Sequence, residues 1–410
     1  MHILFVHKNY PAQFGHIAHH LATRLGHRCT FVSERPPAKG PVERIQYTLQ
    51  GGATNTTHYC SRTFENAVWH SEAVFNALKA RPDIKPDLIV GHSGFASCLY
   101  LRELYDAPIV NYFEYFYHTS RSDMDFLPDF PCTEIDRLRA RTRNAMLLLD
   151  LETCDVGYSP TRWQRSRLPE SFRDKVRVVF DGIDTDVWKP QPNAPRKIGG
   201  FVIPDGVKVV TYATRGMESM RGFHVFMKAA HKLSKLRDDV VFIIAGEDRV
   251  CYGNDEKFTG GKTFKEWVLS QDDYDLSRFV FTGLLPITEL ARLFSITNIH
   301  FYLTTPFILS WSLMDALACG ATVLASDTAP VREVIAHGEN GLLVDFFDVD
   351  GFVSTAMRVL DAPARFRDLG MAGVELVRDR YSLKVCLPQV LGVYQAAAQG
   401  RATKTARPGP

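Results

Sequence analysis

The segment Thr304–Asp348 reads TTPFILSWSLMDALACGATVLASDTAPVREVIAHGENGLLVDFFD. Its pattern predicts a loop, a helix that begins near Ser310–Ser312 and ends at Gly320, and then a buried strand. A second helix start and a final short strand follow at 329–330 and 342–344. A loop that leads from a strand into a helix N-terminus presents free backbone N–H groups to an anion. The segment therefore predicts a site for a nucleotide diphosphate.

On both sides of this segment, strand-like and helix-like patterns alternate. In the N-terminal half we expect strands at 3–6, 29–33, 87–92, 108–113, 156–159 and 176–180, and a helix at 14–25. In the C-terminal half we expect strands at 207–213, 240–245, 279–282 and 299–303, and helices at 225–236 and 289–294. This alternation predicts α/β domains with parallel sheets covered by helices on both faces.

The chain length of 410 residues is enough for two domains. The segment 184–206 is rich in proline and glycine and is typical of a linker. The predicted organisation is an N-terminal domain over 1–183, the linker over 184–206, a C-terminal domain over 207–383, a helix with one apolar face over 384–399, and a disordered tail over 400–410.

Composition narrows the class of protein. The chain is 45% hydrophobic and 23% charged with a net charge of +2, which is typical of a globular protein and gives no argument for nucleic-acid binding. No apolar run is long enough to span a membrane, and the N-terminus reads as a buried strand instead of a signal peptide. The eight cysteines are scattered without metal-binding or disulfide spacing, so we expect reduced thiols, no metal site and a cytoplasmic protein.

The segment Thr304–Asp348 resembles the C-terminal signature of the family 4 retaining glycosyltransferases, which have the GT-B fold. That signature has two glutamates eight positions apart, followed by Ala-x-Ala-x-Gly, an apolar strand and a Gly-Glu-Asn-Gly-like turn. Here Asp315 stands at the second glutamate and Phe307 at the first. The resemblance implies two Rossmann-like, doubly wound domains that face a central cleft, with the last helix packing back on the first domain.

Two arginines, Arg215 and Arg221, lie between a predicted strand and a predicted helix. Guanidinium groups bind phosphate oxygens through paired, charge-assisted hydrogen bonds, although a bare pair of arginines is more often a solvated surface feature. The resemblance implies that both hold the donor diphosphate and stabilise the departing nucleotide. It also implies that Asp315 binds the ribose.

Other donor-site predictions concern backbone positions. Because Phe307 cannot accept a hydrogen bond from a sugar hydroxyl, the N–H groups of Ile308, Leu309 and Ser310 are candidates to contact the phosphate or the sugar. Gly246 and Glu247 follow a predicted strand, and the resemblance places them beside the nucleotide base.

In the N-terminal half, the resemblance implies contacts to the sugar or the acceptor by Gly15 and by Glu114, which stands where many relatives have a histidine. His92, at the end of a predicted strand, and His118, four residues after Glu114, are further candidates for these contacts. Glu114 is also counted with the two arginines as a catalytic candidate. The alternative for either histidine is a partly buried hydrogen-bonding residue.

A basic run, Arg137, Arg139, Arg141 and Arg143, lies on a predicted helix. Such a run can meet an anionic acceptor or associate weakly with a membrane surface through the N-terminal domain. A solvated helix face is the favoured interpretation.

Together these patterns predict a metal-independent, retaining hexosyltransferase-type enzyme without a cofactor. Its donor would be a UDP- or GDP-linked sugar, and its acceptor a hydroxyl of a glycan such as a growing polysaccharide, a lipid or a small metabolite. Phe307 and Asp315 motivate one alternative, a catalytically weak protein that binds a nucleotide or a glycan as a partner. Nothing in the sequence indicates an oligomeric state.

Overall fold

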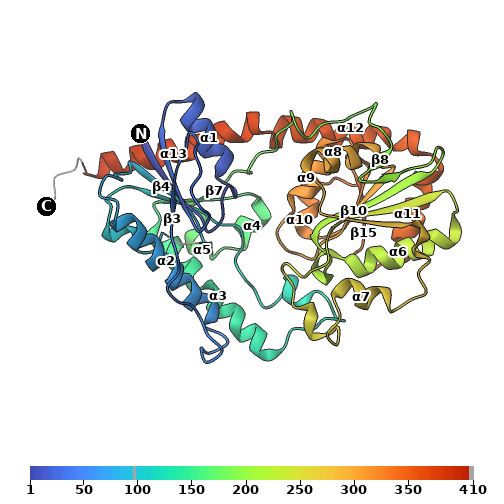
Figure 1. The fold of residues 1–410 in the computed structure, drawn as a ribbon, viewed down its shortest axis with the longest axis horizontal. Helices are drawn as coiled ribbons and strands as arrows, with labels where there is room; N and C mark the ends of the chain where they lie inside the picture. The colour runs from blue at the N-terminus through green and yellow to red at the C-terminus, as the bar shows by residue number, and fades with distance from the viewer. Residues whose placement is uncertain (96–97, 406–410) are drawn as a thin grey trace. The chain divides into compact units, whose positions relative to one another are not determined.

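The computed structural model describes residues 1–95 and 98–405, and the chain folds into two compact units (Figure 1). The N-terminal unit comprises Met1–Ser120, Cys132–Asp181 and the chain from Cys386. The C-terminal unit comprises Arg121–Pro131 and Gly182–Val385.

The N-terminal unit is built on a seven-stranded parallel sheet in the order β3-β2-β1-β4-β5-β6-β7. The strands are β1 (His2–Val6), β2 (Arg28–Ser33), β3 (Glu43–Gln46), β4 (Leu88–His92), β5 (Ile109–Tyr112), β6 (Val156–Ser159) and β7 (Val176–Val178). Every residue of β1, β4 and β5 is buried, as expected for central strands covered on both faces.

Helices cover both faces of this sheet (Figure 1). They are α1 (Gly15–Arg24), α2 (Arg62–Lys79), α3 (Glu134–Thr153), α4 (Arg162–Ser166), α5 (Glu170–Arg173) and α13 (Leu383–Thr405). One core joins α2 and α3 to residues such as Leu4 and Val6, and the other joins α1 and α13 to Ile3 and Phe5. Alternate residues of β1 thus enter opposite cores, which follows from the two-residue period of a strand.

The C-terminal unit has a six-stranded parallel sheet in the order β12-β11-β10-β13-β14-β15, together with the small hairpin β8–β9. The strands are β8 (Lys197–Ile198), β9 (Phe201–Val202), β10 (Lys208–Gly216), β11 (Val240–Glu247), β12 (Phe279–Gly283), β13 (Ile299–Tyr302), β14 (Val323–Ser326) and β15 (Leu342–Val344). This is the strand order of a doubly wound nucleotide-binding sheet.

Seven helices of the C-terminal unit follow these strands: α6 (Phe223–Leu236), α7 (Phe264–Leu269), α8 (Ile287–Ile296), α9 (Trp311–Ala318), α10 (Ala329–Arg332), α11 (Val349–Asp361) and α12 (Arg367–Leu376). The main core of the unit gathers buried residues of α6, α7 and α11 against β10, β11 and β13. Helix α9, which belongs to the segment quoted first, packs against α8 and α12.

One segment from the N-terminal half of the sequence packs on the C-terminal unit. Within Arg121–Pro131, the Phe126 ring lies 5.1 Å from the Phe346 ring, and the Phe130 ring lies 5.3 Å from that of His224. Leu127 enters the main core of the same unit. The sequence pattern did not indicate that this segment packs on the C-terminal unit, because the residues that it contacts lie far away along the chain.

The strands and helices expected from sequence are present, but the structure also departs from the prediction. Residues 184–206, expected to form a linker, contain the hairpin β8–β9 and belong to the C-terminal unit. Strand β3 was not expected, since only one of its four residues is buried and its pattern is weak. Helix α13 continues through Thr405, past the predicted end at residue 399. A single glycine at Gly400 does not end a helix when good helix formers follow it. The rest of the predicted tail, 406–410, lies outside the described residues.

Gly222 offers a test of the C-terminal fold. It has a positive φ of 65° at the start of α6, and a Cβ built there would lie 2.5 Å from Leu303 Cβ. We expect Gly222→Ala to lower the free energy of unfolding by about 2 kcal/mol through strain and steric conflict. Urea denaturation measures the change.

Gly392→Ala, inside α13, is the matched control, because a Cβ at Gly392 meets nothing within 4 Å. We expect this variant to be unchanged or slightly stabilised. Equal stability of the two variants would contradict the packing described at Gly222.

Candidate active site

The C-terminal sheet has a topological switch point at its centre. Strands β11 and β13 pair with opposite edges of β10, so the loops after β10 and β13 lead away from each other. Open α/β sheets bind ligands in the crevice at the carboxyl ends of such strands. The residues that follow β10 and β13 therefore form the candidate donor site.

Arg221 joins these two loops. Its side chain is 4% exposed, and its Nη1 donates to Thr304 Oγ1 at 2.8 Å and to the carbonyl of Ile308 at 3.0 Å. The rings of Tyr252 and Phe307 lie 5.0 and 5.6 Å from its guanidinium carbon. Arg221 is therefore fixed at the switch point by two hydrogen bonds and two aromatic rings.

The charge of Arg221 has no carboxylate partner within the described part of the chain. Both hydrogen bonds leave from Nη1, so Nε and Nη2 are still available to an acceptor. Burial acts to lower the pKa of Arg221, but the neighbouring Tyr302, Tyr252 and Glu218 outweigh it and the pKa is raised. A buried cation without an ion-pair partner is unfavourable, and a bound anion would stabilise it.

Glu218 stabilises the loop that carries Tyr252, next to Arg221. It is fully buried, and its Oε2 accepts hydrogen bonds from the backbone N–H groups of Cys251, Tyr252 and Gly253 at 3.0, 2.8 and 2.9 Å. Three successive N–H groups around one carboxylate oxygen form an anion-binding nest. Glu218 thereby fixes the loop that places Tyr252 beside Arg221.

Asp255 makes a second link between the loops after β10 and β11. Its carboxylate accepts from the backbone N–H of Ser219 at 2.7 Å and from Ser219 Oγ at 2.5 Å. Burial raises the pKa of Asp255 to about 6; the hydrogen bonds from Ser219 oppose this shift, and Glu218 adds to it.

Sequence reasoning missed Glu218, Asp255, Thr304 and Tyr252. An acidic residue between the two predicted arginines was the one available signal.

The remaining donor-site candidates lie around this centre. Arg215 is exposed near the end of β10, and Gly246 has a φ of 145° where a Cβ would collide with the Thr214 carbonyl. Glu247, at the end of the neighbouring strand β11, pairs with Arg249 at 2.5 Å. The structure thus brings Arg215, Gly246 and Glu247 to adjacent strand ends.

Helix α9 supplies the last group of candidates. Ser310 caps the helix and accepts from the N–H of Ser312, but its own N–H donates to Tyr302 Oη at 2.9 Å. That leaves the N–H groups of Ile308 and Leu309 for a ligand. Asp315 is 8% exposed, and burial raises its pKa well above the usual value.

Phe307, at the position of the family glutamate, is buried with its ring 5.5 Å from that of Tyr252. Its side chain thus takes part in an aromatic pair beside Arg221. A glutamate here would place a carboxylate next to the same guanidinium.

In the N-terminal unit, His92 and Glu114 line one cavity of about 290 Å³. His92 is fully buried, and its Nε2 lies 3.8 Å from Glu114 Oε2. Burial lowers the pKa of His92 well below the usual value, and the nearby His7 adds to the shift, so the ring is neutral. The structure thus brings together the two polar candidates from the ends of β4 and β5.

Gly15 and His118 are not among the residues that line this cavity. Gly15 packs against Pro11, where a Cβ would collide with the proline ring. His118 Nε2 lies 2.7 Å from the Arg167 carbonyl oxygen, and burial lowers the pKa of the ring.

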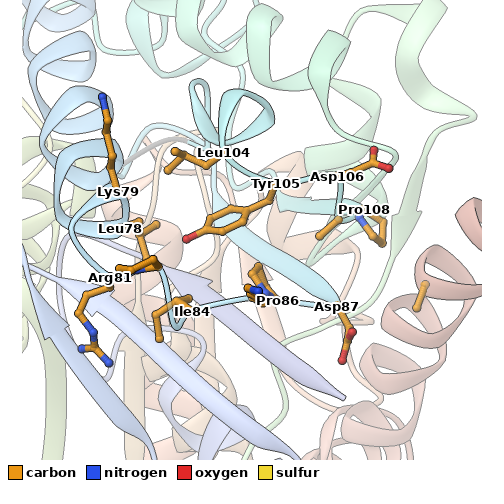
Figure 2. A pocket seen from close by; sticks show the side chains of 14 residues that line it. Leu78, Lys79, Arg81, Ile84, Pro86, Asp87, Leu104, Tyr105, Asp106 and Pro108 are labelled. Atoms are coloured by element: carbon orange, nitrogen blue, oxygen red, sulfur yellow. The ribbon is translucent and has the colours of Figure 1, made fainter.

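A larger hollow of about 680 Å³ lies at the opposite edge of the N-terminal sheet, next to the amino ends of β4 and β5. Figure 2 shows the Tyr105 ring reaching across it toward Leu78 and Arg81. Arg81 already pairs with Glu43 and Asp83, each at 2.7 Å. This hollow lies away from the strand ends where open sheets bind ligands.

No group of three or more His, Cys, Asp or Glu side chains in residues 1–95 and 98–405 is arranged to hold a metal ion. None of the helices in these residues combines the length and apolar character of a membrane span.

The fold has two units, each built on a parallel sheet covered by helices, and comparison with known proteins gives the family. Residues 25–188 match the model of the glycosyl transferase family 4 group, and residues 195–374 match the model of glycosyl transferases group 1. The chain belongs to the family 4, or group 1, glycosyltransferases.

Individual relatives are distant. The chain is 24% identical to alpha-maltose-1-phosphate synthase of Mycolicibacterium smegmatis over 54% of its own length and 57% of that protein. It is 22% identical to D-inositol 3-phosphate glycosyltransferase of Segniliparus rotundus, over 56% and 48% of the two chains. The chain thus spans about half the length of the curated relatives it matches.

Solved structures support the GT-B fold. Sucrose-phosphate synthase from Thermosynechococcus elongatus superposes with a TM-score of 0.74 at 18% identity, covering 98% of this chain and 100% of that one. At these identities the likeness shows the fold alone.

The buried carboxyl of Asp255 predicts a pH dependence of stability. Because its pKa is raised from 3.8 to about 6 on folding, its contribution to stability is fully present below about pH 4 and is lost as the pH rises through 6. We expect the wild type to lose about 2 kcal/mol relative to Asp255→Asn between pH 4 and pH 7. Denaturant unfolding of both proteins at each pH measures the difference.

Asp273→Asn, which changes an exposed carboxylate outside this network, is the matched control. A constant difference between wild type and Asp255→Asn across the pH range would show that folding does not raise the pKa of Asp255.

Proposed function

We propose that this protein transfers a sugar from a nucleotide diphosphate sugar to a hydroxyl group of an acceptor, with retention of the anomeric configuration and without a metal ion or other cofactor. The observation that carries the proposal is the buried guanidinium of Arg221, which is fixed between the loops after β10 and β13 and lacks a carboxylate partner within the described chain. A diphosphate is the counter-charge that this site lacks.

The donor would be held by groups of the C-terminal unit. Arg221 and the exposed Arg215 would bind the diphosphate, and the free N–H groups of Ile308 and Leu309 would contact the phosphate or the sugar. Asp315 would bind the ribose, while Gly246 and Glu247 would lie beside the base. The HepE protein from Anabaena, which superposes with a TM-score of 0.67, was solved in complex with UDP-glucose, and this supports a nucleotide sugar donor.

The chemistry needs electrostatic stabilisation more than it needs a protein base. As the bond between the sugar C1 and the phosphate oxygen breaks, negative charge builds on the diphosphate, and the two arginines stabilise it. The acceptor oxygen attacks C1 on the face that the phosphate leaves, and its proton passes to the departing phosphate. Glu114 and His92, in the cavity of the N-terminal unit, would bind the acceptor hydroxyl.

The acceptor is a hydroxyl of a glycan, a lipid or a small metabolite. A second candidate function is nucleotide binding with little transfer. The burial of Phe307 at the position of a family glutamate favours it, because the sugar then loses one acceptor group. Nucleotide binding without turnover of any donor would distinguish this candidate from the enzyme.

Calorimetric titration with UDP, GDP and ADP in the presence of EDTA tests the proposal. We expect one nucleotide to bind, and Arg221→Ala to weaken its binding about tenfold or more through loss of a charge-assisted hydrogen bond. The preferred nucleotide then directs the screen of donor sugars, and the anomeric configuration of the product reports retention.

Arg358→Ala is the matched control, because Arg358 is exposed on α11. Failure of all three nucleotides to bind would overturn the donor site. Binding that requires an added divalent cation would overturn metal independence.

A further inference from the structure

The basic run on α3 divides into two faces in the structure. Arg137 and Arg141 are exposed, whereas Arg139 and Arg143 are half-buried on the side of the helix that packs toward α2. Arg139 donates to Tyr59 Oη at 3.0 Å and to Thr63 Oγ1 at 3.4 Å. The run is therefore not a uniformly solvated face, which was the favoured interpretation of the sequence.

Arg143 lies on the wall of the 290 Å³ cavity that also contains His92 and Glu114. Its Nη2 donates to Tyr117 Oη at 2.7 Å, and its guanidinium carbon lies 3.7 Å from the centre of the Tyr117 ring. Its Nε is buried without an acceptor, and within the described ranges Arg143 forms no ion pair. The cavity wall thus carries a cation that forms no ion pair with a carboxylate of the described residues.

A second cation, Lys8, lines the same cavity from the end of β1. Its Nζ lies 3.8 Å from Glu34 Oε2, a long and partly exposed ion pair that adds little. Burial lowers the pKa values of His70 and His92, so both histidines that line the cavity are neutral. Against the two cations, the lining offers one carboxylate, that of Glu114.

The other lining groups suit a sugar. Aromatic side chains, among them Phe95, Tyr115 and Tyr117, stand beside small polar groups such as Asn66 and Ser93. Aromatic faces with a few placed polar groups bind small polar ligands, and a cavity of this volume holds one sugar residue with a substituent.

We propose that the acceptor carries an anionic group, a phosphate or a carboxylate, that Arg143 and Lys8 bind while Glu114 and His92 receive its hydroxyls. The inference rests on the proposed function, and it names the class of acceptor. Arg143 is the specificity-determining residue, because its guanidinium stacks on Tyr117 and the planar guanidinium fork matches a phosphate or carboxylate.

Calorimetric titration of the full chain, with and without saturating UDP, GDP or ADP, tests this inference. The probes are glucose 6-phosphate, glucose 1-phosphate, glucuronate and neutral glucose. We expect at least one anionic sugar to bind about tenfold or more tightly than glucose, and Arg143→Gln to remove this preference. Arg143→Lys should restore part of it, and Arg141→Gln, on the exposed face of the same helix, should leave it unchanged.

The anion can also belong to a lipid headgroup, and sedimentation with phosphatidylinositol or phosphatidylcholine vesicles distinguishes this source. Binding to phosphatidylinositol that is lost in Arg143→Gln but kept in Arg141→Gln supports the same cavity with a lipid acceptor. Equal loss in both variants would contradict the proposal, because it would indicate general attraction of α3 to a charged surface.

Two other results would overturn the inference: glucose binding as tightly as every anionic sugar, or a preference for anions that persists in Arg143→Gln. Absence of binding by all sugars and vesicles would also overturn it. Nucleotide titration of the same samples keeps the two proposals separate. Nucleotide binding that is intact in wild type and in Arg143→Gln assigns any failure to the acceptor inference, whereas loss of nucleotide binding in the wild type assigns it to the donor site.

Discussion

The candidate active site depends on one buried cation. Arg221 bridges the loops after β10 and β13 through Thr304 Oγ1 and the Ile308 carbonyl, at the point where the strand order of the sheet diverges. Two neutral acceptors orient the guanidinium without neutralising it. Under the proposed function, a diphosphate would gain the electrostatic interaction with a guanidinium that is already oriented, and little reorganisation would be needed when charge builds up during transfer.

The surrounding residues maintain this arrangement. Glu218 gathers three backbone N–H groups of the loop that carries Tyr252, and Asp255 holds Ser219 in the turn that leads to Arg221. Each of these carboxylates is buried and accepts hydrogen bonds from backbone N–H groups, and neither forms an ion pair with Arg221 in the described chain, although the charge of Glu218 helps to raise the pKa of the arginine. The cavity of the N-terminal unit has a similar feature. Its Arg143 stacks on an aromatic ring and has no acidic partner among the described residues.

Much of the fold could be predicted from the sequence, because the central strands are uniformly apolar and the helix ends carry Ser310 and Gly320 as signals. The family followed from the same segment. What the sequence could not show was which polar residues are buried together. Glu218 and Asp255 look like ordinary surface acids in the sequence, and the four arginines of α3 look equivalent until the packing of α2 separates them. Burial and hydrogen-bond partners arise from contacts between distant segments, which a local pattern does not encode.

The central claim is that Arg221 is the diphosphate-binding group. The most direct measurement is a crystal structure of the protein with its preferred nucleoside diphosphate. The account predicts phosphate oxygens within hydrogen-bonding distance of Arg221 Nε or Nη2, at the carboxyl ends of β10 and β13, with the Nη1 contacts to Thr304 and Ile308 kept. A diphosphate bound elsewhere, with Arg221 contacting only Thr304 and Ile308, would contradict it.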